Sequence, residues 1–386
     1  MNFNLSEQQE MLRAVTREFA AGEIAPIAHE IDASETIPET LRAKLRDNNY
    51  FALLIPEAYG GVECDTVSYV VVVEELSRAS AAVAITISVH NSVAAGPITC
   101  FGSDEQKTYW LPRLAKGSLG AFALTEPGSG SDAAALITRA VRVGEEYVLN
   151  GSKTFVTNGK YADLFVLLAR TNQESKHRGI SAFLVERGAP GLVIGKSIDK
   201  MGIRGSDTVE LSLQDCRVPV SCRLHLEGHG FRVAMESLDG GRIGVAAQAV
   251  GIAQACLDAA SLYARSRYQF GRPIAEFQMI QWMIAEMRTE IQAARLLTLH
   301  AAWLKDEGQP CAPQASMAKL KASAVARMAA DHAVQIHGGY GYTKEYAVER
   351  YYRDAKVTEL YEGTSEIQRI VIANSALHSR DGKVSA

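Results

Sequence analysis

Apolar residues along the chain follow a helical period at both ends and occur in short runs in the middle. The first part predicts helices over 6–31, 39–49, 66–78, 79–100 and 104–115. The middle part is rich in β-branched residues and predicts strands at 120–124, 136–143, 146–149, 153–157, 164–169, 180–186 and 209–213. From about residue 228 the helical period returns over 231–267, 277–307, 313–337, 346–361 and 366–377.

This order predicts a mainly α protein with a β domain in the middle. With 386 residues the chain exceeds the roughly 100–200 residues of one typical domain. We therefore expect an N-terminal α-helical domain over 1–117, a central β domain over 118–227 and a C-terminal helical bundle domain over 228–386. Asn150-Gly151 and Asn158-Gly159 are expected to separate strands in the middle unit.

Charge and cysteine content exclude several classes of protein. Forty basic and forty-four acidic residues give a net charge of −4, which disfavours sequence-independent nucleic-acid binding. The six cysteines are scattered without a C-x-x-C pair, which favours a reducing compartment. The polar start shows no signal or transit segment, and polar residues interrupt the most apolar stretch, 79–97, so we expect a core helix there and no membrane span.

The segment YEGTSEIQR at 361–369 places a carboxylate at a break between two predicted helices. Ser365 and Gln368 have the spacing of a capping box, which would begin the second helix. Gly363 would let a ligand approach the backbone, and a carboxylate held there suits proton abstraction. From these residues alone, an exposed glutamate followed by a glycine cap is the favoured interpretation of Glu362.

A second candidate site is the loop TEPGSGSD at 125–132, which follows a predicted strand. Its glycines and hydroxyls can present backbone and side-chain donors to a flavin edge or a phosphate, although a polar hairpin loop would look the same. The third glycine of a dinucleotide fingerprint is missing. His225 and His229 have no further metal ligands nearby, and no G-x-S-x-G motif supports a hydrolase.

Together these segments resemble the acyl-CoA dehydrogenase family over essentially the whole chain, most closely its short-chain, butyryl-type members, particularly over 238–254 and 361–369. The segments that carry the resemblance are TEPGSGSD at 125–132, KTFVTNG at 153–159, GGR at 240–242, RYQFG at 267–271, QIHGG at 335–339 and YEGTSEIQR at 361–369. Phe155 stands where tryptophan is common in the family, which keeps an aromatic face for stacking.

The resemblance implies a β-barrel-like central domain, a C-terminal four-helix bundle, a homotetramer, and FAD bound between domains and against a neighbouring subunit. Carried over by position, the flavin side would comprise Phe122, Leu124, Thr125, Ser131, Phe155, Val156, Thr157, Thr364 and Glu366. The adenine and diphosphate of a partner's FAD would meet Arg267, Phe270, Gln278, Gln335, Ile336, Gly338 and Gly339. The acyl-CoA contacts would be Ser131, Asp239, Arg242 and Gly363.

The family's reaction removes the α proton of an acyl-CoA and passes the β hydrogen as hydride to flavin N5, giving a trans-2-enoyl-CoA, with electrons going on to electron-transfer flavoprotein. Glu362 matches the catalytic base. Some relatives instead carry the base just before the arginine of the GGR segment, where this chain has Gly241. By the same alignment, 89–92 should lie near the acyl tail, and it lacks the Arg or Lys that a glutaryl substrate would need.

Chain length and branching of the acyl group stay open at this point. Branched short-chain, cyclic or other acyl-CoA substrates, an oxidase or desulfinase on the same scaffold, and a flavin-free scaffold or acyl-CoA carrier are the alternatives. The resemblance implies a cytoplasmic enzyme of bacterial type, or one of the mitochondrial matrix if a transit segment has been removed.

Overall fold

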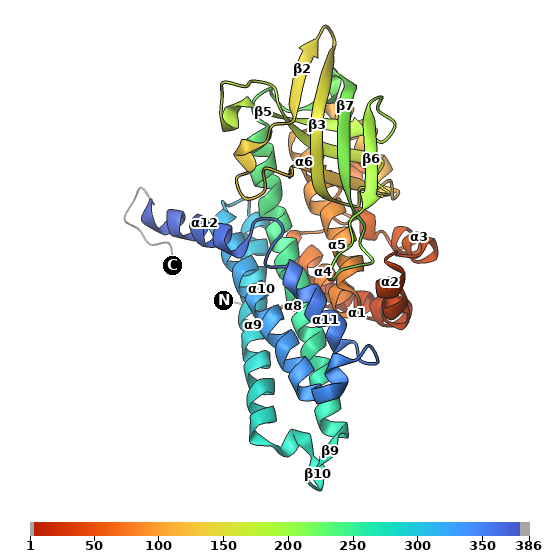
Figure 1. Ribbon diagram of the computed structural model, residues 1–386, viewed down its shortest axis with the longest axis vertical. Coiled ribbons are helices and arrows are strands. Elements are labelled where there is room, and N and C mark those ends of the chain that lie inside the picture. The colour runs from red at the N-terminus through yellow and green to blue at the C-terminus, as the bar shows by residue number, and fades with distance from the viewer. Residues whose placement is uncertain (1–3, 379–386) are drawn as a thin grey trace.

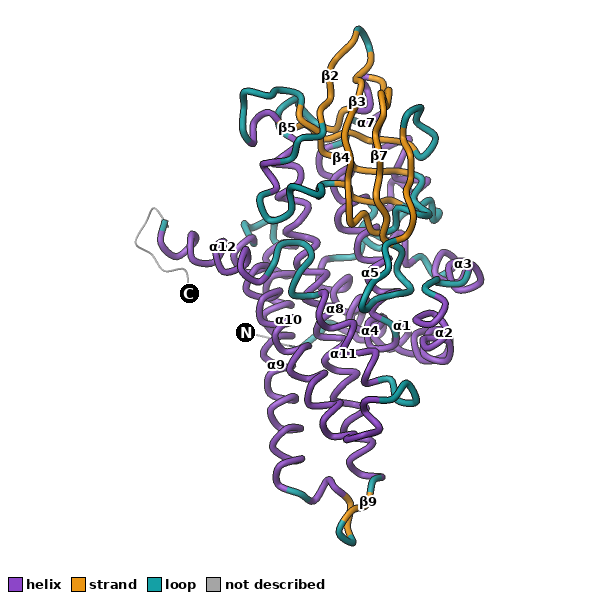
Figure 2. The backbone as a smooth tube through the Cα atoms, viewed as in Figure 1, coloured by secondary structure: helices purple, strands orange, loops and turns teal. Residues whose placement is uncertain are grey.

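The computed structural model describes residues 4–378 and contains a strand-rich region joined to helices on one side. In Figure 1 the strands form the upper part, and the long helices α8 (Gly230–Ser266), α9 (Gln278–Asp306) and α10 (Ala312–His337) pack together in the lower part. The tube in Figure 2 shows that helices make up most of the molecule. The predicted order of helices, strands and helices is confirmed.

The N-terminal region consists of short helices around a buried pair. Its helices are α1 (Glu7–Phe19), α2 (Ala28–Ser34), α3 (Glu39–Asp47), α4 (Thr66–Ala79), α5 (Ala81–Val89), α6 (Gly96–Phe101) and α7 (Asp104–Ala115). Ser6 and Gln9 form a reciprocal capping box that begins α1. A π-helical turn, His90–Ala95, joins α5 to α6.

Between residues 4 and 378, two helical segments are apolar and long enough to cross a membrane, judged by length and composition alone. They are Ala81–Phe101 and α8, and 94% and 83% of their most apolar windows are buried inside the protein. Such burial identifies the first as the core helix that the sequence predicted.

The middle region is an eight-stranded mixed sheet. Its strands are β1 (Gly120–Ala123), β2 (Arg139–Val143), β3 (Glu146–Thr157), β4 (Leu164–Arg170), β5 (Ile180–Glu186), β6 (Leu192–Ser197), β7 (Thr208–Pro219) and β8 (Arg223–Leu224). They pair in the order β6-β7-β3-β2-β4-β5-β8, and β1 runs parallel to β4. The alternating burial along β7 and the complete burial of β4 show that the sheet has an apolar interior.

Two strand predictions were wrong in detail. Asn150-Gly151 does not separate two strands but lies within β3, at a register shift against β7. Gly151 has φ 149°, and a Cβ there would lie 2.5 Å from the Thr138 Oγ1, so the glycine permits a bulge rather than a turn. The edge strand β6 was not predicted either: its three apolar residues, 192–194, are followed directly by Gly195, Lys196 and Ser197, and most of the strand is exposed.

The C-terminal region is a bundle whose helices pack on one another and on α4. It comprises α8 (Gly230–Ser266), α9 (Gln278–Asp306), α10 (Ala312–His337), α11 (Val348–Val357) and α12 (Ser365–Leu377), with a small hairpin of β9 (Tyr268–Gln269) and β10 (Arg272–Pro273). The predicted helix 346–361 is shorter than expected, because its last residues form turns. α8 also packs against β5, so one helix links the sheet to the bundle.

Candidate active site

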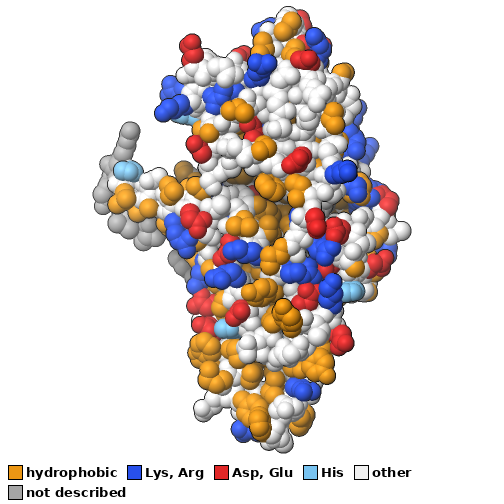
Figure 3. Space-filling model, viewed as in Figure 1, with side chains coloured by type: hydrophobic (Ala, Val, Ile, Leu, Met, Phe, Trp, Pro, Cys, Tyr) orange, Lys and Arg blue, Asp and Glu red, His pale blue; other side chains and the backbone are white. Residues whose placement is uncertain are grey.

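A cavity of about 630 Å³ opens where the sheet meets the bundle. Figure 3 shows the surface hollowed at this level, with apolar side chains gathered around the hollow. The predicted site residues that line it are Phe122, Leu124, Thr125, Ser131, Phe155, Thr157, Arg242, Glu362, Gly363 and Thr364. Val89 and Val93 of the N-terminal unit also line it, so segments from all three predicted units meet at one place.

The base candidate lies in the turn between α11 and α12. Glu362 has φ 53° and Gly363 has φ 93°, so two successive residues adopt the left-handed conformation. For a glutamate this conformation costs about 1–2 kcal/mol and persists only when its surroundings hold it. The Gln368 amide donates to the carbonyls of both residues, at 3.2 and 2.8 Å, and thereby fixes the turn.

The predicted capping box at Ser365 was wrong. Thr364 is the N-cap of α12, and its hydroxyl accepts from the Ile367 N–H. Gln368 then lies one position too far along the helix to complete a box and bonds the preceding turn instead. The helix break that the sequence predicted is confirmed.

The electrostatics of Glu362 favour a carboxyl group that titrates near neutral pH. Burial raises its pKa to about 7, although the positive charges of Lys319 and Arg242 oppose this rise. Its Oε2 atom is buried without a hydrogen-bond partner. A group with this pKa can take up a proton from a ligand in the cavity at neutral pH.

Gly241 gives the Glu362 carboxylate its space. A Cβ built on Gly241 would lie 1.8 Å from Oε2, whereas one on Gly240 would meet nothing closer than the Lys305 side chain at 3.7 Å. The position that carries the base in some relatives thus faces the same spot in the cavity as Glu362. Only one of the two positions can hold a carboxylate side chain without rearrangement.

A buried ion pair supports the loop on the opposite wall. Lys153 Nζ donates to Glu126 Oε1 at 2.7 Å and to the Leu124 carbonyl at 3.0 Å. Glu126 also accepts from the backbone N–H groups of Ile137 and Thr138. Burial raises the pKa of Glu126, but the Lys153 charge and these hydrogen bonds outweigh it and hold the pKa below its usual value. The pair fixes both ends of the glycine-rich loop.

The other residues expected on the flavin side differ in whether they face the cavity. Phe155 has φ 56° and leaves 65% of its surface exposed, so its ring presents a free aromatic face to the cavity. Val156 instead belongs to the core of the sheet, because strand alternation turns it inward. Glu366 is exposed on α12 outside the cavity lining. Asp239 pairs with Arg242 at 2.8 Å and orients that guanidinium.

Of the residues expected near an acyl tail, some line the cavity and others do not. Val89 lines the cavity, but His90 and Asn91 bond elsewhere: the His90 ring accepts from the Gly120 N–H, and the Asn91 amide bonds the backbone of Tyr50 and Leu54. The π-helical turn at this point rotates the side chains away from regular helical positions, which the sequence pattern did not reveal.

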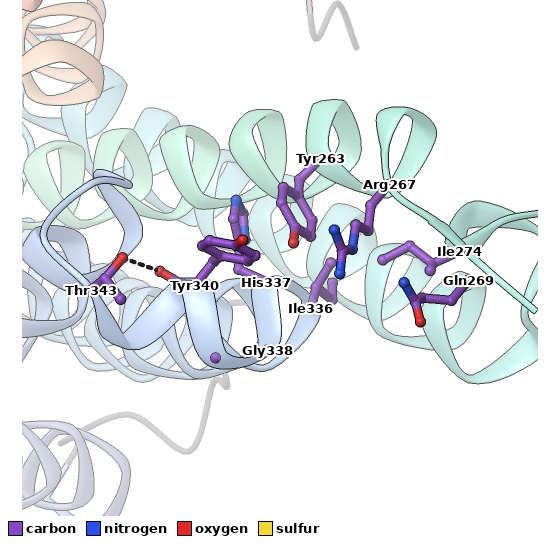
Figure 4. A pocket seen from close by; sticks show the side chains of 10 residues that line it. Tyr263, Arg267, Gln269, Ile274, Ile336, His337, Gly338, Tyr340 and Thr343 are labelled. Atoms are coloured by element: carbon purple, nitrogen blue, oxygen red, sulfur yellow. Dashed lines mark hydrogen bonds between the residues drawn. The ribbon is translucent and has the colours of Figure 1, made fainter.

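A second cavity of about 490 Å³ lies at the far end of α8, beside the β9–β10 hairpin (Figure 4). Four of the residues expected near a partner's FAD line it: Arg267, Ile336, Gly338 and Gly339. Phe270, Gln278 and Gln335 are exposed and do not line it. The ring of His337 stacks on Tyr263 at 4.2 Å, and the Arg267 guanidinium lies 5.7 Å from the Tyr340 ring centre. Aromatic faces beside an arginine suit a planar, anionic ligand.

Sequence reasoning missed the parts that Lys153, Glu126 and Lys319 play. Lys319 is 1% exposed, and its ammonium donates to the carbonyls of Thr358 and Gly363. The sequence did contain a signal for a buried lysine, because Lys319 lies on the same face of α10 as the buried Ala315 and Ala322. A lysine on an apolar helix face requires a partner inside the protein.

The structure gives the two histidines of the H-x3-H spacing no metal site. The rings of His225 and His229 lie edge to face with centres 5.3 Å apart. Within residues 4–378, no group of three or more His, Cys, Asp and Glu side chains is arranged to hold a metal ion.

Family models match the three regions in order. The N-terminal domain of acyl-CoA dehydrogenases matches residues 6–118, the middle domain 121–216 and the C-terminal domain 228–377. The chain belongs to the acyl-CoA dehydrogenase family. It is therefore an oxidoreductase of the class that dehydrogenates acyl-CoA, with the three-domain fold of that family.

Individual relatives align over nearly the whole chain. The short-chain specific acyl-CoA dehydrogenase of Clostridium acetobutylicum is 47% identical, over 97% of this chain and 99% of its own. Butyryl-CoA dehydrogenase from Megasphaera elsdenii has a TM-score of 0.96 at 44% identity, covering 98% of this chain and 100% of that one. A structure described as the electron transferring flavoprotein of Acidaminococcus fermentans gives 0.96 at 49% identity, with the same coverage.

FAD is the cofactor of this family, and the first cavity fits a flavin. A Cβ on Gly128 or Gly130 would meet nothing within 4 Å, so the loop backbone is open to a ligand. Phe155 offers a free ring face from the sheet, and Thr125 and Ser131 add hydroxyl groups along the same wall. These residues would hold a flavin ring between the sheet and the Glu362 turn.

Proposed function

We propose that this protein is a short-chain acyl-CoA dehydrogenase that converts a saturated acyl-CoA to the trans-2-enoyl-CoA, with Glu362 as the base. The observation that carries the proposal is the Glu362 carboxyl group, which lies in the cavity with Oε2 buried and unpartnered and with its pKa raised by burial to about 7. When bound, FAD supplies the hydride acceptor at N5.

Glu362 removes the α proton of the substrate, and the backbone N–H of the same residue donates to the thioester oxygen, where negative charge develops. A donor preorganised at such an oxygen is typically worth about 3 kcal/mol. Arg242, held by Asp239, contacts the acyl-CoA beside the Glu362 turn. Ser131 and Gly363 line the same passage. A bound acyl chain would exclude water and further favour the neutral carboxylic acid that forms once Glu362 takes the proton.

The preference for short chains rests on the relatives. A short-chain specific enzyme and a butyryl-CoA dehydrogenase each share more than two fifths of their residues with this chain over its whole fold. Electron-transfer flavoprotein is proposed as the electron acceptor, since a similar chain occurs in a structure named for that protein.

We further propose a homotetramer in the cytoplasm in which each FAD is shared between two subunits. Arg242 and Arg267 lie 25 residues apart along and just beyond α8, which separates them by about 37 Å at 1.5 Å per residue. This distance is too long for one flavin dinucleotide to span within a single chain. The cavity at Arg267 would therefore receive the adenine and diphosphate of a partner's FAD, with Phe270, Gln278 and Gln335 exposed towards that partner.

The test is anaerobic titration of the purified, FAD-loaded protein with acyl-CoA thioesters. Butyryl-CoA is expected to bleach the flavin absorbance fastest in a panel of straight, branched and cyclic substrates. Rapid oxygen consumption with peroxide release would instead indicate an oxidase. An unchanged spectrum with every member of the panel would refute the proposed function.

A further inference from the structure

Lys319 is a buried cation that no part of the proposed reaction uses. It lies about two turns into α10, which packs against α8, α11 and α12, and only 1% of its surface is exposed. Burial lowers its pKa to about 8, and the negative charge of Glu362 opposes this fall most strongly. A buried lysine that kept no role would be costly, because an ionised amine loses its hydration there.

The ammonium of Lys319 binds the turn that carries Glu362. It donates to the Thr358 carbonyl at 3.0 Å and to the Gly363 carbonyl at 2.8 Å, so it joins the end of α11 to the residue after the base. Ser323, one turn further along α10, donates to the Thr358 carbonyl as well. Lys319 thereby helps to hold Glu362 in its left-handed conformation.

Charged and titratable groups face Glu362 from several elements. Lys319 comes from α10 and Arg242 from α8, and Arg242 is already paired with Asp239 on its own helix. The phenols of Tyr69 on α4 and Tyr361 in the same turn are neutral, since burial raises the pKa of both. Lys319 has two carbonyls as hydrogen-bond acceptors rather than a carboxylate, so its charge is left to act on Glu362.

We propose that Lys319 is a positioning residue for the base: its ammonium fixes the Thr358–Gly363 turn and stabilises the ionised form of Glu362 electrostatically. This inference rests on the proposed function of Glu362 as the proton acceptor. It assigns to α10 a part in the reaction without any contact to the reacting atoms.

Two substitutions separate the two effects. Lys319→Gln keeps a hydrogen-bond donor but removes the charge, and Lys319→Met removes both. The rate of flavin reduction by butyryl-CoA should increase with pH as Glu362 ionises, and we expect the midpoint of this rise to move upward by about one pH unit in both variants. Lys319→Met should also lose about tenfold at the high-pH plateau, because the turn is no longer held.

Lys321→Met is the matched control. Lys321 lies on the same helix, is about one-third exposed and pairs with Glu290. The Lys321→Met substitution should leave the midpoint of the pH profile and the rate at the high-pH plateau unchanged. Lys319→Arg, which keeps the charge, is expected to retain the wild-type midpoint, and it carries the test if the uncharged variants do not fold.

An infrared titration tests Lys319 independently of turnover. The carbonyl band of protonated Glu362 is identified by its absence in Glu362→Gln, and its disappearance with pH is followed in each holoenzyme. A wild-type midpoint in Lys319→Gln and Lys319→Met, or a shifted one in Lys319→Arg, would overturn the electrostatic role. If no acyl-CoA reduces the wild-type flavin, the proposed function fails, but the infrared midpoints still decide this inference.

Discussion

Two buried pairs of lysine and glutamate support opposite walls of the cavity and behave in opposite ways. On the sheet, Lys153 and Glu126 are in direct contact, and the carboxylate accepts two further backbone hydrogen bonds. In the bundle, Lys319 and Glu362 interact through space, and one carboxylate oxygen has no partner. Burial lowers the pKa of both lysines to about 8, yet the pKa of Glu126 is lowered and that of Glu362 is raised to about 7.

The difference shows that a nearby cation does not by itself decide the protonation of a buried carboxyl group. Direct contact with the Lys153 charge and further hydrogen bonds lower the pKa of Glu126, whereas at Glu362 burial outweighs the charges of Lys319 and Arg242. A carboxylate saturated with donors stays ionised and serves as a fixed anchor. A carboxylate left without donors exchanges a proton easily, which suits a base. The sheet pair therefore holds the loop in place, whereas the bundle pair is available for chemistry.

Replacing Glu362 and Glu126 in turn by glutamine is the strongest test of this division between base and anchor. We expect Glu362→Gln to retain FAD and bind acyl-CoA but to lose about 10³-fold in the rate of flavin reduction, because a positioned base typically contributes 10²–10⁴-fold. Glu126→Gln should reduce that rate by no more than about tenfold, since Glu126 contacts Lys153 and the 137–138 backbone but does not line the cavity. Stopped-flow absorbance under anaerobic conditions measures both rates. Rapid bleaching of Glu362→Gln would mean that another group is the base.

Removing the cation of the sheet pair should cost stability rather than rate. Lys153→Met leaves Glu126 buried without its counter-charge, which we expect to lower the free energy of unfolding by about 3–5 kcal/mol. Arg217→Met is the control: its partner Glu146 is exposed on the same sheet, so the change should stay below about 1 kcal/mol. Urea unfolding followed by circular dichroism compares the two. Equal losses would show that burial does not strengthen the Lys153 pair.

The space around the Glu362 carboxylate can be tested with neighbouring glycines. In Gly241→Ala the new methyl group would overlap Oε2, and displacing the base by about 1 Å can lower the reduction rate about 10²-fold. Gly240→Ala adds the same methyl group one residue earlier, where the nearest atom is 3.7 Å away. Its rate should remain close to that of the wild type. If both variants are equally slow, helix packing rather than contact with the base limits the rate.

The sequence predicted the three-part order and the helix break at Glu362 because these follow from local periodicity and glycine positions. It did not predict the function of Lys153 or Lys319, since their partners lie 27 and 44 residues away in the chain. Val156 was assigned to the flavin by position alone, although its place on β3 turns it into the core. Contacts between distant segments, and the face that each strand residue presents, require the folded structure.

The smallest expected effect concerns the pH dependence of stability, which should have opposite signs at the two glutamates. The folded-state pKa of Glu362, about 7, lies above its unfolded value of 4.5, so its stabilising contribution is complete below 4.5 and is lost as the pH rises through 7. Glu362→Gln should therefore gain about 2 kcal/mol over the wild type between about pH 5 and about pH 7. The pKa of Glu126 is lowered, so its contribution to the free energy of unfolding is present above pH 4.5 and is lost as the pH falls. The stability that Glu126→Gln loses relative to the wild type should therefore be smallest at acidic pH. Urea unfolding of the three proteins from about pH 3 to about pH 7 covers both windows and measures both slopes, and slopes of the same sign would contradict the division between anchor and base.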